Sequence, residues 1–483
     1  MTQALDYLSL LKDGLPKSSD PPKSVAIVGA GIAGLTAGLL LKDAGHDVTI
    51  LEAQHRIGGR ILTYRGFAGN MYAELGAMRF PLQHQLGQYL IRERFKLPVE
   101  PFPMYDEDTI IHLQGKSVRR SEFSADMFDF NLPPHEADKN PLELLRATMQ
   151  PLIDIMSSED PDKAWLVLLE KYDNYSLLGY LKERGLSDAA IAMLGPLYNL
   201  EGRYHFSLVE WFLHYYEDVF GDLVYIVDGA DCLPKAFEPY LLNNVRLGAD
   251  VHAIQQSDTK VTVHFRDRTR NSHRVRADEC IITAPLALLR HMEIEGLDPD
   301  KWYALRNSYY GRAHKIFMQF SEKWWQTKYK IDHGLTVTDL AIRNVVYPPA
   351  GQDDRIDKGV IIASYCWEQD SIPYTSMSEI DGITQVLEDL AKIHPEATDT
   401  FEFGIAKDWA LDQYAGGIGP VFRAFEMSGK LYEDTIRPVH RIWFANDGCD
   451  RRHRRWIEGS LRAAIKNAYA IHTGIRNEMP WKD

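Results

Sequence analysis

Cysteine is scarce in this chain of 483 residues. The sequence contains four cysteines, and none of them belongs to a Cys-x-x-Cys pair or to a group of neighbouring Cys and His residues. Zinc sites need such ligand spacing, and a disulfide framework needs more cysteines placed closer together. We therefore expect no metal site, and we expect reduced thiols in a cytoplasmic protein at Cys232, Cys280, Cys366 and Cys449.

Long apolar runs and an excess of basic residues are missing as well. Near the amino end, Tyr7–Leu11 is a short apolar run flanked by charged residues, so we expect neither a signal peptide nor a membrane helix. Asp and Glu number 68 against 54 Lys and Arg, which gives a net charge of −14. Nucleic acids bind to basic surfaces. The sequence thus predicts no membrane and no nucleic-acid partner.

The chain nevertheless has ample material for a large folded core. Apolar residues make up 45% and charged residues 25%, which is ordinary for globular proteins. At about 150 residues per domain, the length suggests roughly three domains. We expect residues 1–23 to form a short helix followed by a polar linker, and no internal repeat is visible.

The first ordered signal is a βαβ unit. Ser24–Val28 predicts a buried strand, helix-forming residues follow, and Asp47–Leu51 predicts a second strand. A glycine motif lies between strand and helix, where it permits a tight turn, close approach to a pyrophosphate and close helix packing. Its residues are Gly29, Gly31, Ala33 and Gly34. Glu52 stands about 20 residues later, where an acid binds ribose hydroxyls, and Ala53 follows it. The unit predicts a dinucleotide site without separating NAD from FAD.

A second glycine motif distinguishes FAD from NAD. Gly58 and Gly59 stand between Arg56 and Arg60, and a turn of this kind can offer amides and a guanidinium to a pyrophosphate. A simple surface turn is the alternative. The stretch from Val25 to Tyr64 resembles the amino-terminal signature of the flavin amine oxidase superfamily, which includes monoamine, polyamine and L-amino-acid oxidases.

The resemblance extends over almost the whole chain and implies an α/β plus α+β fold. A discontinuous Rossmann-type FAD-binding domain is combined with a mixed-sheet substrate-binding domain and a largely helical domain over the active-site entrance. The expected ranges are 24–104, 221–285 and 415–483 for the FAD-binding domain, 105–220 for the helical domain and 286–414 for the substrate-binding domain.

The resemblance also assigns cofactor-binding positions. The expected set consists of Gly29, Gly31, Ala33, Gly34, Glu52, Ala53, Gly58, Gly59, Arg60, Gly76, Ala77, Met78, Arg79, Val251, Asp447, Trp456 and Ile457. Asp447 departs from the family, in which a Gly-Glu pair stands where this chain has Asn446-Asp447. Ile418 stands where monoamine oxidases have a flavin-linking cysteine, so the FAD is expected to be non-covalent.

The L-amino-acid oxidase branch is favoured by the positions that would meet the substrate. Arg79 and Tyr365 match an arginine and a tyrosine that hold the substrate carboxylate, and a guanidinium forks well onto a carboxylate. Trp456 would flank the substrate, and the Arg455 carbonyl could accept its amino hydrogens. Lys315 matches a lysine that holds a water against flavin N5. The alternatives are a structural ion pair for Arg79, core packing for Tyr365 and a solvated strand end for Lys315.

The expected function is FAD-dependent oxidative deamination of L-amino acids. A hydride passes from Cα to flavin N5, and O2 reoxidises the flavin, which yields a 2-oxo acid, ammonia and H2O2. The expected partners are a small L-amino acid, O2 and a second copy of the chain in a homodimer. An L-amino-acid 2-monooxygenase, a monoamine or polyamine oxidase, and a non-catalytic flavin-binding protein stay open as alternatives.

Two features are left unassigned by the sequence. The side-chain preference is open, because the aromatic residues suit large apolar substrates whereas acidic residues such as Glu201 and Glu217 suit Lys or Arg substrates. The run Arg451–Arg455 is most simply a solvated basic face, and steering of anionic substrates is the alternative.

Overall fold

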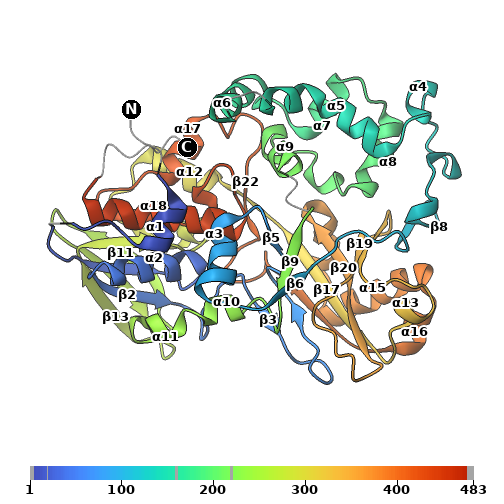
Figure 1. The fold of residues 1–483 in the computed structure, drawn as a ribbon. Coiled ribbons are helices and arrows are strands. Elements are labelled where there is room, and N and C mark those ends of the chain that lie inside the picture. Colours follow the sequence, from blue (N-terminus) through green and yellow to red (C-terminus); the bar gives the residue numbers. More distant parts are fainter. Residues whose placement is uncertain (1–4, 19, 158–160, 218–220, 476–483) are drawn as a thin grey trace.

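A computed structural model describes residues 5–18, 20–157, 161–217 and 221–475. Figure 1 shows a lobe built around α2 and α18, a second lobe of strands around β17 and β20, and a helical layer above them. The N-terminal helix α1 (Tyr7–Asp13) lies against α18 (Ile457–Thr473), the long helix near the carboxyl end. Its first turn is capped by the Asp6 carboxylate, which accepts from the Ser9 amide at 3.0 Å.

The first lobe is centred on a five-stranded sheet whose strands all run parallel. Parallel neighbours need long crossover connections, so strands far apart in the sequence meet in one sheet. The spatial order is β10 (Val245–Leu247), β2 (Asp47–Glu52), β1 (Ser24–Val28), β14 (Glu279–Ile282) and β23 (Ile442–Phe444). Strands from all three predicted FAD-binding segments are therefore present, with α2 (Ile32–Asp43) packed against α18.

A four-stranded sheet joins this lobe through β11. Its order is β13 (Ser272–Ala277), β12 (Val261–Arg266), β11 (Asp250–Gln256) and β15 (Glu293–Ile294). Helix α12 (Pro299–Asn307) also packs here, against α17 (Lys430–Ile436). The start of the range expected for the substrate-binding domain thus lies with the nucleotide-binding lobe, because β15 pairs with β11.

The second lobe contains a seven-stranded mixed sheet. Its order is β21 (Phe401–Asp408), β17 (Ala313–Phe320), β20 (Gly359–Trp367), β19 (Asn344–Tyr347), β18 (Gly334–Thr338), β7 (Ile110–Leu113) and β8 (Lys116–Arg119). The last two strands lie inside the range expected to be largely helical. They join the sheet because β7 is buried along its whole length and pairs in parallel with β18. Helix α15 (Glu379–Ile393) covers β20 and β21.

The helical layer follows β8 in the chain, and four of its helices begin at a side-chain cap. The side chains of Asn140, Ser176, Ser187 and Ser207 accept from backbone amides in the first turn of α5, α7, α8 and α9. The helices are α4 (Pro134–Ala137), α5 (Pro141–Met156), α6 (Pro161–Tyr172), α7 (Leu177–Glu183), α8 (Asp188–Leu197) and α9 (Leu208–Tyr216).

Short elements connect the lobes. They are β3 (Thr63–Tyr64), β4 (Ala73–Glu74), β5 (Phe80–Pro81), β6 (Val99–Pro101), β9 (Leu223–Ile226), β16 (Tyr309–Gly311), β22 (Gly419–Val421), α3 (Gln85–Gln88), α10 (Cys232–Lys235), α11 (Glu238–Leu241), α13 (Trp324–Thr327), α14 (Ile372–Thr375) and α16 (Glu396–Thr400). Among them, β9 pairs with both β5 and β6 in a three-stranded sheet.

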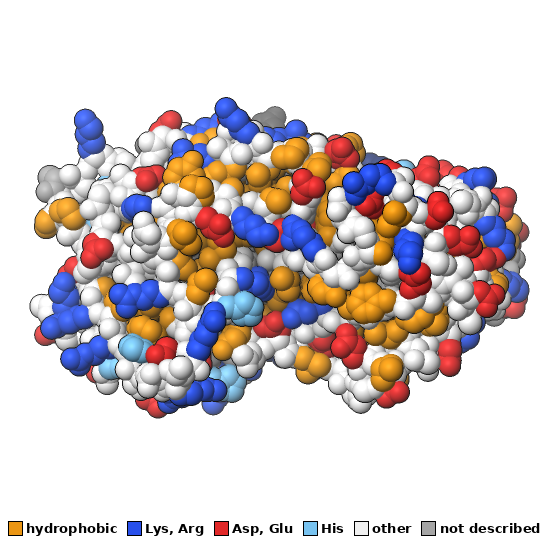
Figure 2. Space-filling model, turned by 90° about the horizontal axis from the view of Figure 1, so that it is seen from below, with side chains coloured by type: hydrophobic (Ala, Val, Ile, Leu, Met, Phe, Trp, Pro, Cys, Tyr) orange, Lys and Arg blue, Asp and Glu red, His pale blue; other side chains and the backbone are white. Residues whose placement is uncertain are grey.

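The molecular surface mixes charges of both signs. Figure 2 shows one face, on which basic, acidic and apolar side chains are interspersed. Over the described ranges, no helix combines the length and the apolar character that crossing a bilayer requires. The same residues contain no cluster of three or more His, Cys, Asp or Glu side chains suited to a metal ion.

Asp173 ties the helical layer to a distant loop. Its side chain is buried, and its carboxylate accepts from the Ser428 amide at 2.9 Å, the Ser428 hydroxyl at 2.6 Å and the Met427 amide at 3.3 Å. The Asp173 carbonyl also accepts from the Phe425 amide. Hydrogen bonds to a buried charged acceptor are among the stronger polar contacts in proteins.

We expect Asp173→Asn to lower the thermal midpoint of unfolding of the holoenzyme. The amide replaces an acceptor by a donor that faces the Ser428 amide, at a cost of about 1.5–3 kcal/mol. Differential scanning calorimetry checks this, with the exposed Asp357→Asn as the matched control. Equal midpoints for the two variants would contradict the role given to Asp173.

Candidate active site

One large cavity of about 1050 Å3 joins the nucleotide-binding lobe, the seven-stranded sheet and the helical layer. Every residue predicted from the sequence to bind cofactor or substrate lines it, with the exception of Gly34. Gly34 instead lies behind the glycine turn, where a Cβ atom would come within 2.0 Å of the Gly29 carbonyl oxygen. The close packing of α2 on β1 therefore depends on this glycine.

The glycine turn and Glu52 form the nucleotide end of the cavity. Gly29 has a φ of +107°, a conformation that glycine adopts without strain, and Gly31 faces open space. The Glu52 carboxylate is buried and accepts from the Ala30 and Gln54 amides, each at 2.8 Å. Burial raises the pKa of Glu52 above its ordinary value. Open backbone at the helix start beside a fixed acid fits the adenosine diphosphate portion of FAD.

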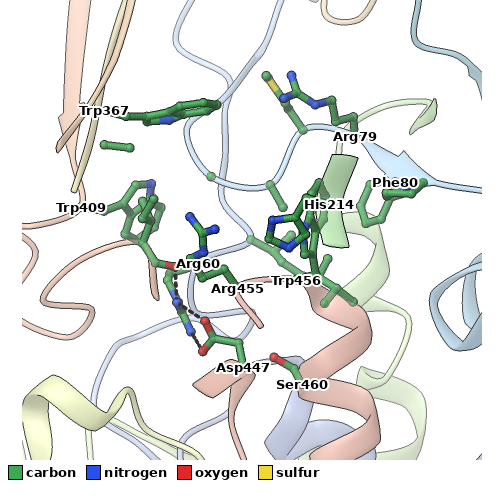
Figure 3. A pocket seen from close by; sticks show the side chains of 18 of the residues that line it. Arg60, Arg79, Phe80, His214, Trp367, Trp409, Asp447, Arg455, Trp456 and Ser460 are labelled. Carbon is green, nitrogen blue, oxygen red and sulfur yellow. Dashed lines mark hydrogen bonds and ion pairs between the residues drawn. The ribbon is translucent and has the colours of Figure 1, made fainter. Parts of the chain in front are cut away.

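An ion pair lies between the nucleotide end and the substrate end. The Arg60 guanidinium donates to the Asp447 carboxylate through Nη1 and Nη2, with Nη1 to Oδ2 at 3.0 Å (Figure 3). Nη1 also donates to the Ile418 carbonyl. Burial disfavours the Arg60 charge, but Asp447 outweighs this and raises the pKa of Arg60. The pair keeps both charges in place beside the expected flavin diphosphate and ribityl positions.

Lys315 holds the backbone around Gly76 from the sheet side. Its Nζ donates to the Glu74 carbonyl at 3.0 Å and to the Gly76 carbonyl at 2.8 Å, and the Met78 Sδ lies at 3.8 Å. A thioether is a weak acceptor, so a water molecule can compete for the third N–H. Burial, together with the nearby charge of Arg79, lowers the pKa of Lys315 to about 7.

Arg79 and Tyr365 reach the same part of the cavity from different elements. Tyr365 on β20 pairs in register with Lys315 on β17, and its ring centre lies 5.0 Å from the Lys315 Nζ. Arg79 follows the Gly76–Met78 stretch and precedes β5. Burial lowers the pKa of Arg79, and Tyr365 is the largest opposing influence. Figure 3 shows Arg79 and Trp367 on opposite sides of the cavity.

Trp456 forms a further wall, together with histidines that sequence reasoning missed. The Trp456 indole N–H donates to His214 Nε2 at 3.1 Å, and the Trp456 ring meets the His84 ring edge-on at 5.2 Å. Burial and the charge of Arg455 lower the pKa of His214 well below its ordinary value. His214 is therefore a neutral acceptor for the indole. No motif marks this histidine, which sits in an aromatic stretch of α9.

Arg455 adopts a left-handed backbone conformation, with a φ of +67°. Glycine is favoured in that conformation, so the arginine adopts it against its backbone preference. The Arg455 guanidinium points to the buried Glu210 carboxylate on α9, with Nη2 to Oε1 at 3.0 Å. Its charge is thereby paired, and the helical layer is joined to the start of α18.

The expectation that Arg451–Arg455 forms a solvated basic face is wrong. Arg451 and Arg454 are buried, with 7% and 2% of their surfaces exposed. Arg451 lies over the Tyr432 ring at 4.2 Å, and Arg454 lies over the Phe422 ring at 3.4 Å while donating to the Gly448 carbonyl. Aromatic faces and carbonyls thus take the place of water around these guanidinium groups.

Comparisons with known proteins agree with this site. Residues 32–472 match the family described as flavin containing amine oxidoreductase. An L-amino-acid oxidase from Siganus canaliculatus is 33% identical over 97% of this chain and 89% of its own length. A putative L-amino-acid oxidase, YobN, from Bacillus subtilis is 31% identical over 97% of this chain and 98% of its own.

Solved structures show the same fold. Wild-type putrescine oxidase bound to putrescine superposes with a TM-score of 0.77 at 20% identity, covering 93% of this chain and 99% of its own. Cyclohexylamine oxidase from Brevibacterium oxydans gives a TM-score of 0.72 at 20% identity, with coverage of 94% and 99%. The predicted fold class and the predicted FAD cofactor are confirmed. With its glycine turn, its buried acid and its match from Ile32 to His472, this chain belongs to the family of flavin-containing amine oxidoreductases, enzymes that use FAD.

Proposed function

We propose that this protein oxidises L-amino acids, as an L-amino-acid oxidase. The observation that carries the proposal is the placement of a half-buried guanidinium, Arg79, and a phenol, Tyr365, around Lys315 at the end of the cavity away from the glycine turn. The names of curated relatives support it. An amine substrate without a carboxylate offers Arg79 no anionic partner.

The chain's own residues bind and orient the substrate. Arg79 forks onto the substrate carboxylate, and the Tyr365 hydroxyl donates a further hydrogen bond, so Cα is held in one orientation. His214 stays neutral and adds no charge next to the substrate amine. Bound FAD would supply the redox chemistry, as the hydride acceptor for Cα and the electron donor to O2. The resulting imino acid then hydrolyses to a 2-oxo acid and ammonia.

We also propose that the FAD is bound non-covalently, in a cytoplasmic homodimer. All four cysteines are free thiols, and none of them lines the cavity. Ile418, at the position where monoamine oxidases carry the linking cysteine, does line it. Acid precipitation followed by absorption spectroscopy of the supernatant tests the cofactor linkage, light scattering after size-exclusion chromatography tests the dimer, and cell fractionation tests the location.

We predict that the purified protein releases H2O2 with L-amino acids. A peroxide assay compares L-amino acids, their D-enantiomers and the corresponding decarboxylated amines. We expect peroxide and 2-oxo acid with the L-amino acids, because only they place a carboxylate on Arg79 and the α-hydrogen at the flavin. Peroxide release with the amines alone would contradict the proposal. Formation of an amide and CO2 would identify a 2-monooxygenase instead.

The carboxylate clamp has its own prediction. We expect Arg79→Met to lower kcat/KM for L-amino acids by about 100- to 1000-fold, because a carboxylate then enters a buried site without its charged partner. Tyr365→Phe removes one neutral donor and should cost about 10-fold or less. Steady-state kinetics measures both, and an unchanged visible flavin spectrum is the control for folding. An unchanged kcat/KM in Arg79→Met would refute the clamp.

Lys315 has a separate prediction, on the reaction with oxygen. Because its pKa is about 7, its positive charge is present below pH 7 and lost above it. A charge there stabilises the negative charge that develops on oxygen. We therefore expect the reoxidation rate, followed by stopped-flow absorbance, to fall as pH rises through about 7. Lys315→Met should be about 10- to 100-fold slower and independent of pH. The exposed Lys139→Met is the control, and a pH-dependent Lys315→Met would overturn this role.

A further inference from the structure

A second arginine, Arg203, faces the substrate end of the cavity. It lies in the short helical turn Glu201–Arg203 between α8 and α9 and lines the same cavity as Arg79 and Tyr365. Its guanidinium carbon lies 4.1 Å from the centre of the Trp367 ring. Trp367 stands two residues beyond Tyr365 on the same face of β20, and the two ring centres are 4.9 Å apart. The order along the wall is thus Tyr365, Trp367, Arg203.

Arg203 is held firmly in this position. The neighbouring Glu201 forms an ion pair with Arg343, which also meets Asp370 at 3.3 Å. Gly202 lies so close to the Trp367 carbonyl that an added Cβ would be 3.2 Å from the oxygen. The Arg203 amide donates to the Leu200 carbonyl at 2.8 Å. The helical turn is therefore docked on the end of β20, and the guanidinium is placed before any substrate arrives.

Arg203 has no ion-pair partner among the residues that the structure describes, whereas Arg455 is paired with Glu210. Glu368, directly after β20, also lines the cavity, and its charge attracts Arg203 without ion-pair contact. Its carboxylate accepts from the Tyr309 hydroxyl at 2.7 Å and from the Arg312 amide at 3.1 Å. Burial and the like charges of Arg455 and Arg79 lower the pKa of Arg203 to about 9, so it stays charged at neutral pH.

Arg79 and Arg203 together carry two positive charges, and one substrate carboxylate can neutralise only one of them. The α-carboxylate of any amino acid would pair with Arg79, and Arg203 would remain without an ion-pair partner beside Trp367. Burying a charge without such a partner is costly, and a substrate that supplies the partner gains what the empty site lacks. A second carboxylate on the substrate side chain would supply it.

From this geometry we propose that Arg203 binds a carboxylate on the substrate side chain, so that the preferred substrates are acidic L-amino acids, L-aspartate and L-glutamate. The proposal rests on the proposed L-amino-acid oxidase function and deepens it. It also resolves the choice between apolar and basic side chains, because Glu201, which would suit a basic substrate, is neutralised by Arg343.

The matched substrates L-glutamate and L-glutamine test the proposal, since they differ only in the charge of the side-chain end. We expect kcat/KM to be about 10- to 100-fold higher for L-glutamate than for L-glutamine. The same difference is expected between L-aspartate and L-asparagine. In Arg203→Gln this ratio should collapse toward one, while activity with L-glutamine persists. The exposed Arg276→Gln should keep the ratio of the unmodified enzyme.

A binding measurement gives a readout that does not depend on turnover. Glutarate and butyrate serve as substrate analogues that cannot be oxidised as amino acids. Butyrate carries one carboxylate, and glutarate carries two. We expect glutarate to raise the thermal midpoint of the holoenzyme more than butyrate does, and Arg203→Gln to remove the difference. Equal responses of the unmodified enzyme to both would overturn the proposal.

The two proposals fail in different ways. Oxidation of L-leucine or L-lysine with no preference for acidic substrates, and a glutamate-to-glutamine ratio unchanged in Arg203→Gln, would reject the role of Arg203 and leave the oxidase function intact. Oxidation of amines with no activity toward any L-amino acid would reject the oxidase function itself.

Discussion

One continuous series of contacts through the centre of the molecule sets the geometry of the site. The Asp447 carboxylate holds the Arg60 guanidinium, the Arg60 carbonyl lies against the α-carbon of Gly76, and the Gly76 carbonyl accepts from Lys315. These four residues come from three distant parts of the chain, since only Arg60 and Gly76 lie in the same stretch. An added Cβ on Gly76 would lie 1.8 Å from the Arg60 oxygen, so even one methyl group would separate the nucleotide end from the substrate end.

Charge at the substrate end follows from that framework. The stretch that Lys315 fixes leads directly into Arg79. The turn before α9 brings Arg203 to the cavity, and α9 places Glu210 against Arg455. Glu210 pairs with Arg455, while Arg203 forms no ion pair among the described residues and lies over Trp367. Aromatic neighbours keep water away, and a low dielectric strengthens each remaining charge. The proposed acidic substrate matches this arrangement, because its two carboxylates would pair with Arg79 and Arg203.

Local sequence patterns predicted a large part of this arrangement. The strand, glycine turn and helix from Ser24 to Asp43 form as expected, because their contacts lie within a short stretch of chain. The family, the fold class and the use of FAD are confirmed by the comparisons. The roles of individual residues such as Arg79 and Lys315, and the domain boundaries, stay predictions.

By itself, the sequence determined the βαβ unit and its acid at Glu52, since both depend on spacing between near neighbours. Only the tertiary structure decided which distant side chains share the cavity. The docking of the helical layer brings Arg203 onto Trp367 and His214 onto Trp456. Packing also buries Arg451 and Arg454, which belong to a run that looked like a solvated face. Those contacts join residues far apart in the chain, and no local periodicity encodes such pairings.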